Sequence, residues 1–123
     1  MTLENEKRLL LLMSSYILET DVTKNRVLDY IESKNWVNFV SRDLETKQNR
    51  DELVWRNDFA FVRKHLALEG LYVSGVRNDW SITTKGIFEL KSLCKQAASE
   101  ESFKKASIFA KQSAVHLLKE LEK

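Results

Sequence analysis

The most constraining feature of this 123-residue sequence is the placement of its helix-breaking residues. The chain contains no proline, and its three glycines, Gly70, Gly75 and Gly86, all lie in one short stretch. Because proline and glycine interrupt helices most strongly, every other part of the chain is free to be helical. The sequence therefore predicts a mainly helical protein with one turn-rich segment between residues 70 and 86.

Apolar residues at helical spacing predict five helices. The first two run from about residue 4 to 19 and from about 24 to 34, and the third begins near 53 or 54 and ends at Gly70, a favourable C-terminal cap. A fourth begins at Thr83 or Thr84 and runs to about residue 97, and the last spans about 102 to 121. The polar segment 41–52 is expected to be either a short helix or an ordered loop.

After the third helix the apolar period changes from 3.6 to 2. Residues 71–74 (Leu-Tyr-Val-Ser) and 80–82 (Trp-Ser-Ile) alternate in the manner of strands, and residues 75–79 are typical of a turn. Three helices, a β-hairpin and another helix is the order of a winged helix-turn-helix, a mainly α (α+β) fold. We expect residues 1–97 to form this DNA-binding domain and residues 98–123 to form a C-terminal helix used for docking or dimerisation.

The charge distribution permits a nucleic-acid ligand without requiring one. The net charge is only +2, so the chain lacks the strong basicity typical of nucleic-acid binders. The first 22 residues carry two lysines or arginines against four acidic residues, whereas residues 23–50 carry six against four. This mild asymmetry is compatible with a basic face.

A polar strip on the third helix is the surface expected to meet DNA. It combines cations and an amide with small residues, which let a helix backbone come close to a groove while Arg and Asn reach bases or phosphates. Any exposed helix face also collects such residues for solubility, and the position of the strip directly before the hairpin favours the DNA interpretation. The candidate DNA-binding residues are Arg56, Asn57, Ala60, Arg63 and Lys64 on the third helix, Arg77 and Asn78 at the hairpin tip, and Lys24 and Asn25 at the start of the second helix.

A second strip on the third helix is apolar and consists of Phe61 and Leu68. An exposed apolar pair of this kind is expected to pack against another element. The last helix is the natural cover, supplied either by the same chain or by a second copy in a homodimer.

The central residues also resemble a known family. The matching residues are 55–63 (Trp-Arg-Asn-Asp-Phe-Ala-Phe-Val-Arg), Leu66, Gly70 with Leu71, 80–83 (Trp-Ser-Ile-Thr) and Gly86. They are similar to the N-terminal winged-helix domain of Mrr-type restriction-system proteins, which also occurs attached to HNH-class endonucleases. The sequence departs from the family at Val62, where alanine is usual, and in its last helix. The resemblance implies binding of double-stranded DNA, including modified DNA, as the targeting module of a restriction or phage-defence system that has a nuclease partner.

No residue pattern predicts an enzyme. Residues 45–47 (Glu-Thr-Lys) with Asp29 or Asp43 have the composition of a restriction-nuclease metal site, but their surroundings lack the strands that carry one. The two histidines, His65 and His116, lie in different helices, and Cys94 is predicted to be a buried small hydrophobe. We therefore expect no catalytic, metal or cofactor site.

The single cysteine and the absence of a long apolar run in the sequence predict a cytoplasmic protein without a membrane partner. The leading hypothesis is a DNA-binding protein, acting as a targeting module or as a transcriptional regulator. The alternative is a protein-interaction or dimerisation adaptor of the same fold class without nucleic-acid contact.

Overall fold

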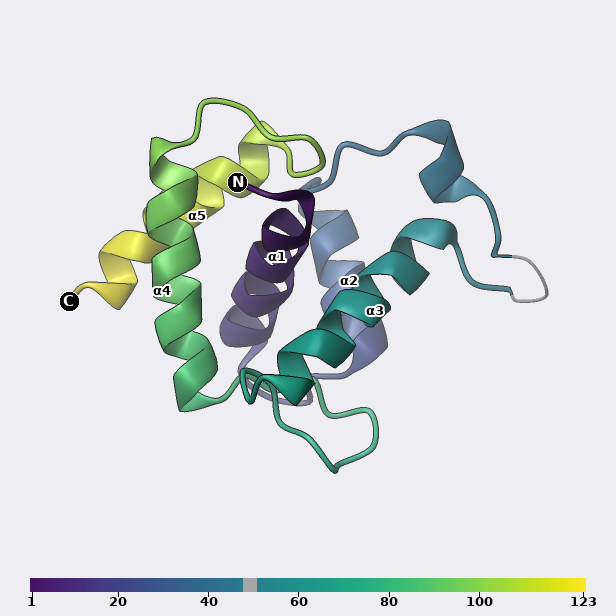
Figure 1. The fold of residues 1–123 in the computed structure, drawn as a ribbon, viewed down its shortest axis with the longest axis horizontal. Helices are drawn as coiled ribbons and strands as arrows, with labels where there is room; N and C mark the ends of the chain where they lie inside the picture. Colours follow the sequence, from purple (N-terminus) through teal and green to yellow (C-terminus); the bar gives the residue numbers. More distant parts are fainter. Residues whose placement is uncertain (48–50) are drawn as a thin grey trace.

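The computed structural model describes residues 1–47 and 51–123. These residues form five α-helices and one short 3-10 helix: α1 (Leu3–Leu18), α2 (Lys24–Ser33), η1 (Ser41–Leu44), α3 (Val54–Leu68), α4 (Thr84–Ser99) and α5 (Ile108–Leu121). Helix α1 lies at the centre and packs against α2, α3 and α4, while α5 packs against α4 (Figure 1). The prediction of a mainly helical chain is confirmed, and the bounds of the first four helices agree with expectation to within two residues.

Helix α1 is buried on more sides than the single apolar face expected of it. The five side chains from Leu9 to Met13 are all completely buried. A stretch of helix that is apolar on every side is stable only when other elements surround it. The arrangement of α2, α3 and α4 around α1 meets that condition, and it makes α1 the core of the molecule.

Hydroxyl side chains determine where several helices begin. The Oγ1 atoms of Thr23 and Thr83 accept hydrogen bonds from the backbone N–H groups of Arg26 and Gly86, at the starts of α2 and α4. Such caps satisfy N–H groups that have no partner within the helix. Because Ser107 caps α5 in the same way, that helix begins about one and a half turns later than predicted.

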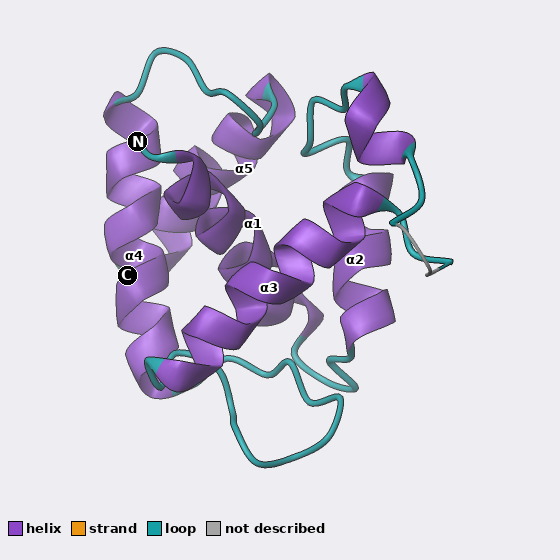
Figure 2. Cartoon of the chain, turned by 45° about the vertical axis from the view of Figure 1, so that its right-hand side comes forward, coloured by secondary structure: helices purple, strands orange, loops and turns teal. Residues whose placement is uncertain are grey.

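The predicted β-hairpin is not formed, and the winged helix-turn-helix fold class is therefore wrong for this structure. The described residues contain no strand, and of the expected hairpin only an isolated bridge between Tyr72 and Ile82 is present (Figure 2). Beyond that bridge, Val73 N–H bonds to Ser81 O, but Trp80 N–H turns away to the carbonyl of Val22. The side chain of Trp80 is buried in the core, so the pairing of the two segments ends there. Residues 73–81 therefore form a loop, which we call loop 73–81.

Helix α5 contributes to the same hydrophobic core as the rest of the chain, through Ala110, Ala114 and Leu117. It does not cover the apolar strip on α3, where Phe61 and Leu68 are 61% and 78% exposed. The expectation that the last helix of the same chain covers this strip is therefore wrong. None of the described helices is both long enough and apolar enough to span a lipid bilayer.

Candidate nucleic-acid interface

The fold brings the candidate DNA-binding residues of three separate segments onto one surface. Arg56 on α3 donates from Nη2 to Asn25 Oδ1 at the start of α2, at 3.4 Å. The backbone N–H of Lys24, the first residue of α2, donates to Asn78 Oδ1 in loop 73–81, at 3.1 Å. Arg63 on α3 donates to Asp79 O in the same loop, at 2.8 Å. The start of α2, the outer face of α3 and loop 73–81 are thus joined by hydrogen bonds in which the predicted residues themselves take part.

Arg56 holds helices together and has little surface to offer a ligand. Its Nη1 lies 3.1 Å from Asp29 Oδ1 and 3.7 Å from Glu32 Oε1, both on α2. Its guanidinium stacks over the ring of Trp55, and only 17% of its side chain is exposed. Two carboxylates therefore compensate its charge, and its main effect is to fasten α3 to α2.

Arg63 supports loop 73–81 but keeps an uncompensated charge. Its Nη2 donates to the carbonyl oxygens of Val73 and Asp79, and its guanidinium lies 5.4 Å from the centre of the Trp80 ring. Within the part of the chain that the structure describes, no carboxylate forms an ion pair with it. Arg63 therefore contributes positive potential to this surface, while its Nη2 is directed at the loop.

Lys64 and Arg77 are the accessible cations of the surface. Both side chains are exposed, and neither forms an ion pair with residues 1–47 or 51–123. Asn57 and Ala60 beside them are half-buried. Lys24 pairs with Glu52 at 2.5 Å, so its charge is compensated.

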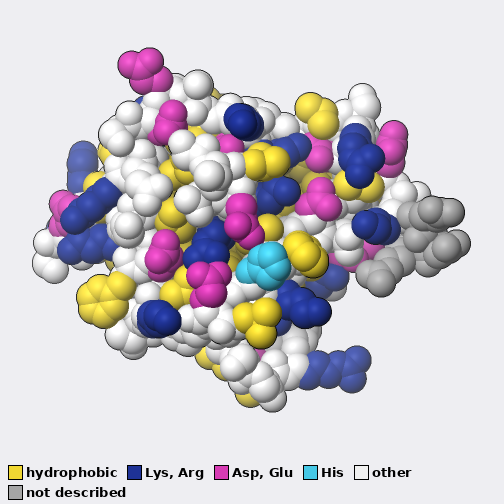
Figure 3. Space-filling view, in the orientation of Figure 1, with side chains coloured by type: hydrophobic (Ala, Val, Ile, Leu, Met, Phe, Trp, Pro, Cys, Tyr) yellow, Lys and Arg dark blue, Asp and Glu magenta, His cyan; other side chains and the backbone are white. Residues whose placement is uncertain are grey.

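Two further lysines that sequence reasoning missed lie beside the predicted strip. Lys7 of α1 and Lys47 line a shallow hollow of about 320 Å³ together with Asn57, Asp58 and Phe61. Their positions in the sequence gave no signal, because only the packing of α1 and of the segment after η1 places them next to α3. Over the whole face, basic, acidic and apolar side chains are interspersed (Figure 3).

Both aspartates considered for the candidate nuclease site have other partners. Asp29 pairs with Arg56, and Asp43 accepts hydrogen bonds from Val40 N–H and from Lys105 Nζ, at 2.9 and 2.5 Å. Burial alone would raise the pKa of Asp43, but the bonds from Lys105 and Val40 outweigh it and hold the pKa below its usual value.

His65 and Cys94 have structural surroundings. The ring of His65 packs edge-on against Phe61 at 4.7 Å, and its Nδ1 lies 3.0 Å from Glu4 Oε1. Cys94 is completely buried on α4, as predicted, and burial raises the pKa of its thiol to about 12. A thiol that stays protonated is a poor nucleophile and metal ligand.

Comparisons of this chain with protein-family models, with curated proteins and with solved structures gave no match. The resemblance to Mrr-type proteins accordingly stays a prediction from the sequence.

Proposed function

We propose that this chain is a DNA-binding module that places the outer face of α3 and loop 73–81 against a duplex. One observation supports this proposal: hydrogen bonds join the three segments that carry the predicted residues into one surface. These bonds connect Arg56 with Asn25, Lys24 with Asn78, and Arg63 with Asp79. A surface assembled from several segments and held by its own hydrogen bonds is preorganised for a rigid ligand.

Each residue has a distinct role in this proposal. Lys64 and Arg77 neutralise phosphates, and Asn57 contacts base edges or the backbone. Ala60 lets the helix backbone approach the groove. Arg56 and Arg63 position α2 and the loop, and Arg63 adds positive potential. Such a module serves in the cytoplasm as the targeting part of a restriction or defence system with a nuclease partner, or as a transcriptional regulator.

The test uses the exposed cations, because removing Arg56 or Arg63 also removes contacts between elements. We expect the Lys64→Ala/Arg77→Ala double variant to bind a labelled duplex of about 30 base pairs at least tenfold more weakly at low salt. The slope of log affinity against log salt should fall by about two, because each phosphate contact contributes roughly 0.9. Fluorescence anisotropy between about 50 and 200 mM salt measures both, with methylated and unmethylated duplexes compared.

The matched control is Lys95→Ala/Lys104→Ala, which removes the same charge from exposed positions on α4 and the segment before α5. If the two double variants lose affinity equally, the binding is non-specific attraction and the assignment of the surface is wrong. If the unmodified protein binds neither duplex at low salt, the DNA proposal is abandoned.

A second candidate, an interaction adaptor, is favoured by the apolar strip on α3. Phe61 and Leu68 are exposed on the same helix whose Arg56 is neutralised by two carboxylates. Exposed large apolar side chains are typical of protein–protein contacts. If the strip is a homodimer interface, the unmodified protein sediments as a dimer and Leu68→Ser sediments as a monomer. Duplex binding of the same variant is measured separately.

A further inference from the structure

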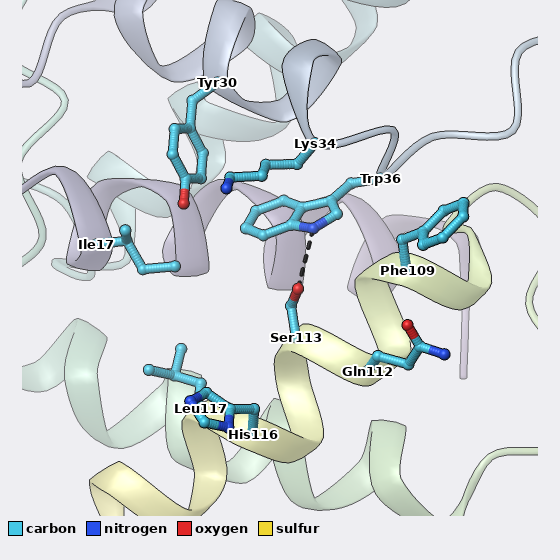
Figure 4. Close-up of a pocket in the computed structure, with 9 residues that line it drawn as sticks. All are labelled: Ile17, Tyr30, Lys34, Trp36, Phe109, Gln112, Ser113, His116 and Leu117. Carbon is cyan, nitrogen blue, oxygen red and sulfur yellow. Dashed lines mark hydrogen bonds between the residues drawn. The ribbon is translucent and has the colours of Figure 1, made fainter.

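An apolar groove lies between α5 and the segment around the end of α2. It has a volume of about 460 Å³, and its largest apolar walls are Trp36, Tyr30 and Phe109 (Figure 4). Trp36 Nε1 donates to Ser113 Oγ on α5 at 3.2 Å, which joins the two sides of the groove. Trp36 is only 1% exposed, so its ring forms the floor of the groove, and the apolar surface open to a ligand comes from Tyr30 and Phe109.

The groove continues over the outer face of α5. Gln112 and His116 line both the groove and a second hollow of about 310 Å³, whose other walls include Ile108 and Val115. Ile108 and Phe109 at the start of α5 are 59% and 53% exposed. The result is one extended apolar surface along α5, which we call the α5 groove.

The rim of the α5 groove has one sign of charge. Lys34, Lys111 and Lys119 line it, together with the imidazole of His116, and none of the lining residues is acidic. Lys34 Nζ lies 5.3 Å from the centre of the Tyr30 ring, and Lys111 Nζ donates to the carbonyl of Glu100. Both contacts leave the ammonium charges without a carboxylate partner among the described residues.

We propose that the α5 groove binds an acidic amphipathic helix of a partner protein. The apolar side of such a helix covers Phe109, Ile108 and Val115, and its carboxylates meet the lysines of the rim. The shape favours a peptide over a small molecule, because the surface runs along a helix and stays open instead of enclosing its ligand. A DNA duplex would satisfy the lysines but offers no comparable apolar surface to the exposed side chains.

A second copy of the same helix is a poor occupant. Lys111, Val115 and Lys119 follow one another at intervals of four residues and therefore lie on one stripe of α5. A two-fold axis at Val115 would place Lys111 of one copy against Lys119 of the other, and like charges at close range repel. The proposal is independent of the DNA proposal, since the two surfaces share no residue.

The test uses three labelled peptides of about 18 residues, all with leucines at helical spacing. The remaining positions are glutamate in the first peptide, glutamine in the second and lysine in the third. We expect the full chain to bind the glutamate peptide in fluorescence anisotropy at least tenfold more tightly than the lysine peptide. Phe109→Ala should weaken the binding of the glutamate peptide about tenfold, because it removes exposed apolar contact area. Lys34→Ala/Lys119→Ala should weaken it and reduce its salt dependence.

The controls are Phe88→Ala and Lys95→Ala, which remove an exposed aromatic ring and an exposed ammonium group from α4. Unchanged binding in these variants supports the assignment to the α5 groove. The proposal is overturned if no peptide binds up to about 1 mM, which corresponds to about −4 kcal/mol. It is also overturned if the three peptides bind equally, if the controls lose as much affinity as the groove variants, or if the protein sediments as a dimer that Phe109→Ala dissociates.

Discussion

Asp43 and Glu6 are carboxylates that the fold buries, and each accepts a hydrogen bond from a distant part of the chain. Asp43 is 5% exposed and accepts from the backbone at Val40 and from Lys105, which lies 62 residues further along the chain. A buried charge is tolerated only when such partners replace water. These residues therefore connect segments that the local sequence pattern leaves independent.

The pKa of Asp43 leads to a prediction about acid stability. Because this pKa is lower in the folded chain than in the unfolded chain, the contribution of Asp43 is fully present above about pH 4, the unfolded value. It is lost as the pH falls from there through the folded pKa, since the unfolded state then binds more protons. We expect Asp43→Asn to cost about 2 kcal/mol at pH 7 and to flatten the fall in stability below pH 4. Urea unfolding at pH 7, 4 and 3 measures this, with the exposed Glu101→Gln as control, and equal pH profiles for both variants would contradict it.

At the scale of elements, α4 packs closely against the segment that follows α3. A Cβ atom on Gly86 would lie 2.1 Å from the carbonyl oxygen of Leu71 and 2.6 Å from Ile82 Cγ1. The first contact is with the backbone, which cannot move aside as a flexible side chain would. Gly86 therefore lets the first turn of α4 rest directly on residues 71 and 82.

Gly86→Ala should consequently destabilise the fold by about 3 kcal/mol, at the upper end of the usual cost of overpacking. Gly75→Ala is the contrasting change: its φ of +80° disfavours alanine, but no atom lies within 4 Å of the added Cβ. That variant should cost only about 1 kcal/mol. Chemical unfolding of both variants measures the difference, and an equal loss of stability would show that the segment before α4 yields easily.

For the whole molecule, Glu6 closes the chain by joining its first helix to the segment before its last. The carboxylate, 1% exposed, accepts hydrogen bonds from the N–H groups of Lys104, Lys105 and Ala106, at 3.2, 2.9 and 2.9 Å. Three N–H groups directed at one carboxylate fix the bend at residues 104 and 105, directly before the Ser107 cap of α5.

Glu6→Gln should lower the free energy of unfolding by about 2 kcal/mol, because it replaces charge-assisted hydrogen bonds with neutral ones and supplies one acceptor oxygen instead of two. Hydrogen exchange at the amides of Lys105 and Ala106 should quicken more than at the amides of α2. Glu4→Gln, at an exposed position of the same helix, serves as the control. Uniform acceleration along the chain would instead indicate that Glu6 acts only through global stability.

The predictable part of the candidate site consists of side chains that face solvent. Lys64 and Arg77 are exposed, as a helix projection and a turn pattern indicate. The compensation of Arg56 by Asp29 and Glu32 was not predictable, because the partners lie on another helix whose packing angle the sequence pattern does not specify. The approach of Lys7 and Lys47 to Asn57 has the same cause.

Local interactions were enough to determine the first four helices of this protein. Hydroxyl caps such as Thr23 and Thr83, apolar spacing and the absence of proline all act within a few residues, so the sequence alone placed the first four helices. Tertiary structure decided the rest. Residues 71–82 alternate like a hairpin, yet Trp80 N–H bonds to the carbonyl of Val22 and the Trp80 side chain enters the core. Burial of the indole stabilises the fold more than the few hydrogen bonds of a short, isolated two-stranded ladder would. Contacts between residues distant in the chain determined the conformation of loop 73–81, the partners of Arg56 and Arg63, and the position of α5.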